Sequence, residues 1–366
     1  MRLNILVLPG DGIGIEITRE GVKALRAVAQ VFGHELELSE GLIGGASLDA
    51  TGEPITEATL RAANAADAVL MGAVGTPKYD DAPSHLRPEK GLLGIRRAMG
   101  VFANLRPVKA YPALFPASPL KEARIQGTDL LILRELTGGL YFGSPRGVEG
   151  AGAQRCAVNT MTYSYAEIER IARMAFELAR KRRKHVTSVD KANVLETSQL
   201  WRSVVVEIAR DYPDVALDHL YVDNAAMQLI LRPSAFDVLL TENLFGDILS
   251  DEAAVIGGSI GLLPSGSLGS PRADGTLPGL YEPIHGSAPD LAGKGIANPL
   301  GTIGSVAVML DWSFGLKAEA RAVQDAIDHV LAAGPTTPDL LGGTGTTSSV
   351  GDAIVARILA SSKVAQ

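Results

Sequence analysis

The 366-residue sequence contains a single cysteine, Cys156. One cysteine cannot form an intrachain disulfide, and such usage is typical of a reducing compartment. No apolar run approaches the roughly 20 residues that span a membrane. The apolar run at the N-terminus ends after a few residues at Pro-Gly-Asp-Gly, which predicts a first strand and not a secretion signal. We therefore expect a cytoplasmic protein with no membrane partner.

The chain also carries fewer positive than negative charges. The chain has 34 lysines and arginines against 41 aspartates and glutamates, a net charge of −7. This balance argues against a nucleic-acid partner held through its phosphates. One basic run, RKRRK at 180–184, is compatible with a patch for polyanions. The same run ends a periodic helix, where cations favourably meet the carbonyl end of the dipole, and we favour this second interpretation.

The remaining composition is that of an ordinary globular protein, with 46% hydrophobic and 20% charged residues. A chain of this length exceeds the usual size of a single core, which predicts two domains. Runs typical of strands alternate with helical patterns, and this alternation predicts an α/β fold with a mostly parallel sheet. The expected strands are 4–8, 68–71, 130–133, 186–189, 217–222 and 237–240, and the expected helices are 14–31, 165–183, 197–210, 243–258 and 318–332.

A glycine-rich motif, GDGIG at 10–14, follows the first expected strand and opens a helix. This placement favours a Rossmann phosphate loop, but the third glycine of G-x-G-x-x-G is absent. Two interpretations stay open, a dinucleotide bound at this loop and a plain turn from strand to helix.

Two aspartates, Asp247 and Asp251, lie one turn apart on the helix expected at 243–258. Like charges at this spacing share a helical face and repel, so either the face is solvated or a cation lies between them. Asp223 follows the strand at 217–222, at the strand end where α/β proteins build their sites. Three carboxylates would suit Mg²⁺ or Mn²⁺ and not zinc. The alternative is a helix with ordinary surface charges.

Five further side chains point to chemistry on a small acid. Arg96, Arg106 and Arg134 carry guanidinium forks that match carboxylates, and they predict a di- or tricarboxylate ligand. Lys191 directly follows an expected strand, and a lysine beside a metal ion can become neutral and act as a base. Tyr141 offers a phenol that could donate a proton. A surface lysine and a core tyrosine are the simpler alternatives.

A second small-residue segment, HGSAPDLAGKGIANP, occupies 285–299. Its first four residues, 285–288, offer consecutive backbone N–H groups that can approach phosphates. Asp290 is placed to accept hydrogen bonds from both ribose hydroxyls. A carboxylate there would repel a 2′-phosphate, which predicts NAD as the cofactor rather than NADP.

Taken in order, these segments resemble the isocitrate/isopropylmalate dehydrogenase family of β-decarboxylating dehydrogenases, which also contains homoisocitrate and tartrate dehydrogenases. The matching motifs run from the first strand to about residue 310. They are GDGIG, GLLGIRR, ANLRP, RELTGGLYFG, SVDKANVLE, YVDNAAM, NLFGDILSD and HGSAPDLAGKGIANP.

The resemblance implies a two-domain, non-Rossmann α/β fold with helices on both faces of a mostly parallel sheet. A discontinuous cofactor-binding domain would comprise about 1–101 and 258–366, and about 102–257 would form the domain for dimerisation, substrate and metal. The family forms homodimers with shared active sites. The residues that would reach the site from the partner chain are Lys191, Val194 and Asp223.

The resemblance also implies a role for each candidate residue. Lys191 matches the base and Tyr141 the proton donor. The residues that match the substrate contacts are Arg96, Arg106, Arg134 and Asp223, and those that match the ligands of Mg²⁺ or Mn²⁺ are Asp223, Asp247 and Asp251. The residues that match the NAD contacts are His285, Gly286, Ser287, Ala288, Pro289, Asp290, Leu291 and Asn298. In this family GDGIG contributes to a cleft wall and does not hold the phosphates.

Substrate choice in the family depends on the segment that matches 89–93, where this chain has Glu89, Leu92 and Leu93. An apolar lining suits an isopropyl group, and burying a bare carboxylate against Leu92 would cost several kcal/mol. We therefore expect NAD-dependent oxidative decarboxylation of 3-isopropylmalate in leucine biosynthesis. The alternatives are a relative that acts on D-malate or tartrate and a non-catalytic regulatory paralogue.

The chain departs from the family pattern at two positions. Ile15 replaces the usual proline, and it is expected to loosen the start of its helix. Glu242 replaces a small residue, and it is expected to add negative charge close to the metal or the cofactor.

Overall fold

The computed structural model describes residues 1–272 and 276–361. The chain divides into two compact units. The first comprises Met1–Val101, Tyr111–Pro119 and the chain from Gly257 onward, and the second comprises Phe102–Ala110 and Leu120–Ile256. Each unit contains its own set of neighbouring strands.

The strands of the first unit have the order β2-β1-β3-β12-β11. β1 pairs in parallel with β2 and β3, β3 pairs in parallel with β12, and β11 is antiparallel to β12. Their bounds are β1 Arg2–Gly10, β2 Glu35–Glu40, β3 Ala68–Ala73, β11 Pro264–Leu268 and β12 Gly279–Pro283.

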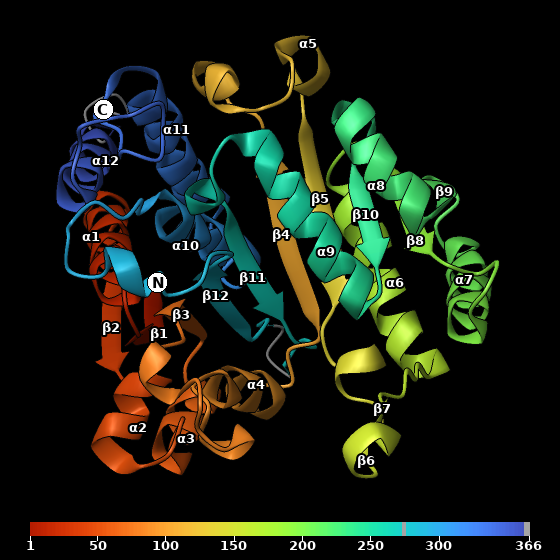
Figure 1. Ribbon diagram of the computed structural model, residues 1–366. Helices are drawn as coiled ribbons and strands as arrows, with labels where there is room; N and C mark the ends of the chain where they lie inside the picture. The colour runs from red at the N-terminus through yellow and green to blue at the C-terminus, as the bar shows by residue number, and fades with distance from the viewer. Residues whose placement is uncertain (273–275, 362–366) are drawn as a thin grey trace. The chain divides into compact units, whose positions relative to one another are not determined.

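Helices cover both faces of this sheet. Successive residues of a strand point to opposite faces, and Leu70 faces the helix α1 while its neighbours Val69 and Met71 pack with Ile95 of α4. The helices α1, α10, α11 and α12 pack together on the face to which Leu70 points (Figure 1). The bounds are α1 Gly14–Phe32, α2 Gly45–Thr51, α3 Glu57–Ala65, α4 Glu89–Ala98, α10 Leu300–Trp312, α11 Lys317–Ala333 and α12 Thr347–Ser361.

The strands of the second unit have the order β4-β5-β10-β8-β9. β5, β10, β8 and β9 are parallel to one another, whereas β4 is antiparallel to β5. Their bounds are β4 Ala103–Lys109, β5 Asp129–Glu135, β8 His185–Asp190, β9 Ala216–Tyr221 and β10 Val238–Thr241. The predicted α/β fold with a mostly parallel sheet is therefore confirmed.

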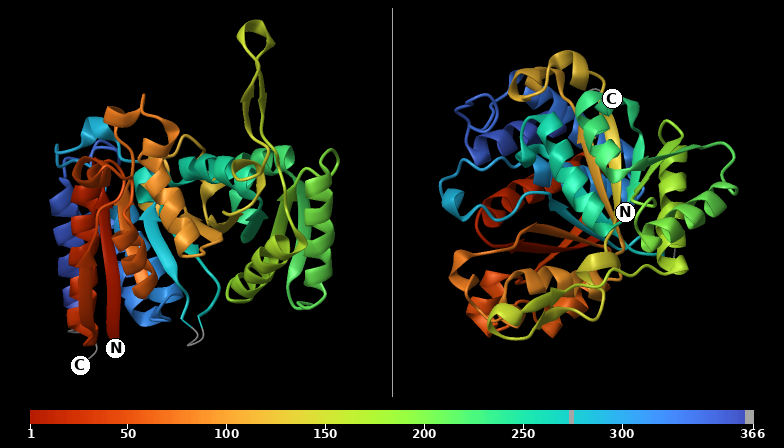
Figure 2. Two further views of the ribbon diagram at one scale, coloured as in Figure 1. Left: turned by 90° about the horizontal axis from the view of Figure 1, so that it is seen from below. Right: turned by 45° about the vertical axis from the view of Figure 1, so that its right-hand side comes forward.

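The helices of the second unit are α5 Glu122–Ile125, α6 Tyr165–Arg180, α7 Glu196–Ala209, α8 Val222–Leu231 and α9 Asn243–Ala254. Ser164 and Glu167 form a capping box that starts α6. A two-stranded hairpin of β6 Gly147–Glu149 and β7 Cys156–Val158 extends from the body of this unit (Figure 2), and all its strand residues are exposed.

Three local expectations can be compared with the structure. The helix expected at 243–258 ends at Ala254 and continues as a 3₁₀ turn at Val255–Gly257. α1 begins at Gly14 although Ile15 replaces proline. The basic run is bonded to carboxylates of its own unit, since Arg180 contacts Asp214, and Arg182 contacts both Asp129 and Asp237.

Among the described residues, no helix is long and apolar enough to cross a membrane.

Candidate active site

The helix α9 follows β10 and carries two of the three aspartates. Their side chains are unequally exposed. The Asp247 side chain is 34% exposed and that of Asp251 64%. Both contact Arg106 of β4, whose guanidinium nitrogens lie 3.7 Å from Asp247 and 3.3 Å from Asp251. A guanidinium therefore lies between the like charges, which offsets the repulsion expected from their spacing.

Amide side chains fix both arginines of this cluster. Arg106 donates from Nε to Asn104 at 2.8 Å and from Nη1 to the Ser250 hydroxyl. Arg134 of β5 donates from Nε and Nη2 to the same oxygen of Asn243, at 3.0 and 2.8 Å. Its Nη1 contacts a carboxylate oxygen of Asp247. Both arginines are buried, with 8% and 5% exposure, so neither is a merely solvated charge.

Tyr141 joins the same cluster from a 3₁₀ turn, Gly139–Tyr141, that follows β5. Its hydroxyl donates a hydrogen bond of 2.9 Å to Asp247, and Arg134 lies 5.8 Å from the ring centre. Burial raises the pKa of the Tyr141 phenol above its usual 10.0, and the hydrogen bond to Asp247 raises it further. The phenol thus keeps its proton near neutral pH and can donate it.

Lys191 and Asp223 form a separate ion pair in the second unit. β8 and β9 are parallel, with Asp190 opposite Tyr221, so the residues after these strands meet at one edge. Lys191 Nζ lies 2.5 Å from Asp223 Oδ1, and this hydrogen bond lowers the pKa of the Asp223 carboxyl. Asp190 is buried and accepts two hydrogen bonds of 2.8 Å from Arg202, which fixes the strand end that carries Lys191.

The described residues of a single chain supply only some of the ligands that a metal ion would need. Within residues 1–272 and 276–361, no group of three or more histidines, cysteines, aspartates or glutamates gathers closely enough to hold a metal. Asp223 is therefore not grouped with Asp247 and Asp251 in a single protomer. The two carboxylates of α9 are hard oxygen donors and fit Mg²⁺ or Mn²⁺ as part of a shell that other oxygens would complete.

The first unit contains Arg96 and the segment expected to select substrate. Arg96 of α4 donates from Nη2 to Glu282 of β12 at 2.7 Å, and its buried Nε has no hydrogen-bond partner among the described residues. Leu92 packs partly against the core cluster, whereas Leu93 is 37% exposed and Glu89 is exposed. Of the two leucines, Leu93 is therefore the more accessible to a ligand.

The expected cofactor loop rests on the glycine-rich motif. The N–H of Ile13 donates to the carbonyl of Ser287 at 2.9 Å. A Cβ at Gly12, whose φ is +56°, would lie 2.2 Å from the same carbonyl oxygen, so only glycine fits there. Of the two open interpretations, the contacts fit a strand-to-helix turn that supports the 285–291 loop.

The loop itself has features that fit a dinucleotide. Burial lowers the pKa of His285, which favours the neutral ring near pH 7, and the buried Nε2 has no partner within the described part of the chain. Ala288 adopts a left-handed φ of 38°. Asn298 is buried, and its amide already bonds Asp339 and the N–H of Leu300. The exposed members are Gly286, Pro289, Asp290 and Leu291.

Several residues that hold the site were missed in the sequence, namely Asn104, Asn243, Ser250 and Glu282. Asn104 had a usable signal, because residues two apart in a strand share a face and Arg106 is two positions on. The other three depend on contacts between distant elements, which no local pattern reveals.

Buried arginine forks beside paired carboxylates and a tyrosine, on an α/β scaffold, are the kind of groups that suit a small carboxylic acid. The sequence pattern described as isocitrate/isopropylmalate dehydrogenase matches residues 4–354. The chain belongs to this family, and it is an oxidoreductase.

Two relatives match almost end to end. The 3-isopropylmalate dehydrogenase of Halalkalibacterium halodurans is 57% identical over 99% of both chains. That of Nitratidesulfovibrio vulgaris is also 57% identical, over 98% of this chain and 100% of the relative. Among solved structures, the isocitrate dehydrogenase of Methylococcus capsulatus is similar with a TM-score of 0.85 at 35% identity, covering 97% of this chain and 99% of that one. The β-decarboxylating dehydrogenase of Thermococcus kodakarensis gives a TM-score of 0.77 at 36% identity, covering 98% and 96% of the two chains.

Proposed function

We propose that this protein catalyses the NAD-dependent oxidative decarboxylation of (2R,3S)-3-isopropylmalate to 4-methyl-2-oxopentanoate and CO₂, a step of leucine biosynthesis. The observation that carries the proposal is the cluster of Arg106, Arg134, Tyr141 and the two aspartates of α9. The names and the high identity of the relatives support the choice of substrate.

The proposed substrate contacts follow from charge and shape. Arg96, Arg106 and Arg134 bind the two carboxylates, since their forks suit bidentate contacts. Leu93 contacts the isopropyl group, with Leu92 and Glu89 of the same helix beside it. The unpartnered Nε of Arg96, among the described residues, supports its role as a ligand-binding group.

The proposed chemistry assigns one proton to each of two residues. Lys191 takes the C2 hydroxyl proton as the alcohol is oxidised, and Tyr141 donates a proton to C3 after CO₂ leaves. Asp247, Asp251 and a third aspartate, Asp223, would hold Mg²⁺ or Mn²⁺, which when bound supplies Lewis-acid polarisation of the C2 oxygen. Asp223 is now paired with Lys191, and engagement of Asp223 by a dication would release the lysine and favour its neutral form.

We also propose that the working form is a homodimer in which Lys191, Val194 and Asp223 reach the partner's site. Val194 is 61% exposed. The helices α8 and α9, which contact each other, expose further apolar side chains, and such patches typically mark protein interfaces. These side chains are Met227, Leu231 and Ile248.

The proposed cofactor is NAD, bound by the loop from His285 to Leu291 with Asn298 at its edge. The exposed carboxylate of Asp290 supports NAD over NADP, because it would repel a 2′-phosphate. The cytoplasmic location expected from the sequence is part of the same proposal.

The test is the formation of NADH, followed by absorbance, with 3-isopropylmalate, NAD⁺ and Mn²⁺. We expect kcat/KM for 3-isopropylmalate to exceed that for D-malate and tartrate. A preference for D-malate or tartrate would replace the proposed substrate, and no NADH with any of the three would favour a regulatory paralogue.

A further inference from the structure

Glu242 is a buried carboxylate directly before α9. It is 2% exposed. Its two oxygens accept hydrogen bonds from the N–H groups of Phe245 at 2.9 Å and Leu244 at 3.3 Å. A carboxylate in this place caps the helix and interacts favourably with the positive end of its dipole. The charge expected near the metal or cofactor is therefore directed at the start of the helix.

Tyr163 completes the cap from a different part of the second unit. Its hydroxyl donates to Glu242 at 3.1 Å and accepts from the N–H of Asn243 at 2.9 Å. The N–H of Gly246 donates to the main-chain carbonyl of Glu242 at 2.9 Å, which is the first bond of the helix itself. The N–H groups of a helix's first turn have no partners within the helix, and in α9 those of Asn243, Leu244 and Phe245 are bonded by Tyr163 or Glu242.

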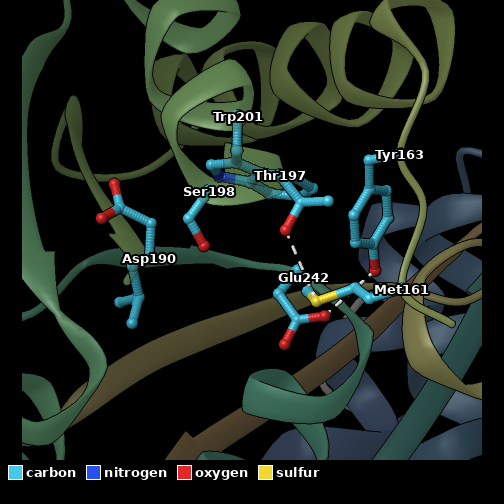
Figure 3. A pocket seen from close by; sticks show the side chains of 8 residues that line it. Met161, Tyr163, Asp190, Thr197, Ser198, Trp201 and Glu242 are labelled. Carbon is cyan, nitrogen blue, oxygen red and sulfur yellow. Dashed lines mark hydrogen bonds between the residues drawn. The ribbon is translucent and has the colours of Figure 1, made fainter. Parts of the chain in front are cut away.

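Behind this cap lies a small pocket in which Tyr163 is fixed by packing. Tyr163 is 8% exposed, and its ring meets that of Trp201 edge to face, with centroids 5.5 Å apart. Figure 3 shows the Tyr163 hydroxyl pointing toward the Glu242 carboxylate, with Thr197 of α7 bonded to Met161 beside them. Two buried rings in contact leave the hydroxyl little freedom to move.

The cap is connected to the substrate arginine through Asn243, the first residue of α9. The Asn243 side-chain oxygen accepts two hydrogen bonds from Arg134, and its NH₂ group donates to the carbonyl of Gly138 at 3.1 Å. With Nε and Nη2 held in this way, Nη1 of Arg134 faces Asp247 one turn along the same helix. A rotation of the first turn of α9 would therefore move Arg134 and Asp247 together.

We propose that Glu242 and Tyr163 are positioning residues for the reaction, which fix the first turn of α9 and thereby the placement of Arg134 and Asp247 for substrate and metal. This inference rests on the proposed function. Neither residue touches the reacting atoms; both act through the helix and through Asn243. A cap with a purely structural role would stabilise the fold without changing the affinity for substrate or metal. A positioning role would change both, so kinetics and Mn²⁺ binding distinguish the two.

The test uses the full-length variants Tyr163→Phe and Glu242→Gln. Each removes hydrogen bonds from the cap while keeping the size of the side chain. We expect KM for 3-isopropylmalate to rise about two- to tenfold, the effect of losing one or two hydrogen bonds. KM for NAD⁺ should stay at the wild-type value, since the 285–291 loop belongs to the other unit.

A second readout needs no turnover. Mn²⁺ is titrated into each protein with 3-isopropylmalate present and NAD⁺ absent, and free Mn²⁺ is measured by electron paramagnetic resonance. The apparent Mn²⁺ dissociation constant should rise by a similar factor in both variants. If one variant fails to fold, the other retains the test.

The matched controls are Tyr165→Phe, which removes an exposed hydrogen bond of 2.8 Å to Glu207, and Thr197→Val, which removes the hydrogen bond from Thr197 to Met161 in the same pocket. Both should match the wild type in KM and in Mn²⁺ binding. Variants with unchanged KM and Mn²⁺ affinity but less active protein would overturn the proposal and leave a structural cap. Failure of the wild type itself to reduce NAD⁺ would instead contradict the proposed function.

Discussion

The side-chain nitrogen of Lys191 lies 2.5 Å from Asp223, so the proposed base and a proposed metal ligand form an ion pair in the single chain. The pair holds the two side chains together. In the proposed mechanism, engagement of Asp223 by a cation would release Lys191, which would link the lysine's role to metal binding.

Replacement of this lysine tests the link. Lys191→Ala should lower kcat about 10²- to 10⁴-fold, because general base catalysis contributes that much. The measurement is NADH formation at saturating substrate and Mn²⁺. Lys184→Ala is the control, since the Lys184 side chain forms a 3.6 Å surface pair with Asp214 in the same unit. Near-normal turnover of Lys191→Ala would remove lysine from this role.

Tyr141→Phe should lower kcat by about a hundredfold, since the proton donor is lost. Burial and the hydrogen bond to Asp247 raise the pKa of Tyr141 above 10.0, so the wild-type donor is present at neutral pH and is lost only as the pH rises through that raised pKa. The measurement is kcat as a function of pH. Tyr165→Phe should retain wild-type activity, and a Tyr141→Phe enzyme with an unchanged rate would contradict the assignment.

Arg134→Lys should raise KM for 3-isopropylmalate at least tenfold or so, because an ammonium cannot reproduce the fork that bonds Asn243 and Asp247 together. The same substitution at Arg173, which is paired with Glu169 and Asp211 on the surface, is the control. Equal KM values for the two variants would show that the positive charge at 134 is enough without its geometry.

The buried cap predicts an unusual dependence of stability on pH. Burial raises the pKa of Glu242, while hydrogen bonds from Phe245 and Leu244 oppose the rise. A carboxyl whose pKa is raised on folding stabilises the protein most below its unfolded value of 4.5, and that stabilisation is lost as the pH rises through the folded pKa. The free energy of unfolding of the wild type should therefore fall relative to Glu242→Gln over this range.

Urea unfolding at a fixed protein concentration between pH 4 and pH 8 measures this difference. Glu53→Gln, at an exposed position, controls for the general effect of removing one negative charge. A difference that grows in favour of the wild type as the pH rises would mean that Glu242 is better stabilised as an anion than its burial indicates.

The parts of the fold that could be predicted from the sequence are those with a clear period. α6 is expected at 165–183 and spans Tyr165–Arg180, since its apolar stripe is regular. The helix ends three residues earlier than expected, and the chain then turns and reaches a left-handed φ of 59° at Lys184. α10 was missed because it is apolar on nearly all sides, and a fully buried helix shows no stripe. The short β11, with the sequence PSGSL, has no alternation to detect.

Some residues of the candidate site could likewise be predicted from the sequence, and others could not. Arg106 and Arg134 stood out because each is a charge within an apolar run, and the structure places both at the aspartates of α9. Their roles in catalysis stay predictions. Glu242 could not be interpreted from the sequence, because its partner Tyr163 is 79 residues away and only the fold brings them together.

The central claim is that a complete site takes Asp247 and Asp251 from one protomer and Lys191 and Asp223 from the other. It is tested most directly with a heterodimer of one Asp247→Ala chain and one Lys191→Ala chain, purified by two different affinity tags. In a symmetric dimer with shared sites, one of the two sites is then intact, and activity should be about half that of the wild type. Both variant homodimers should be inactive. A heterodimer as inactive as the two homodimers would show that each site is built from a single chain.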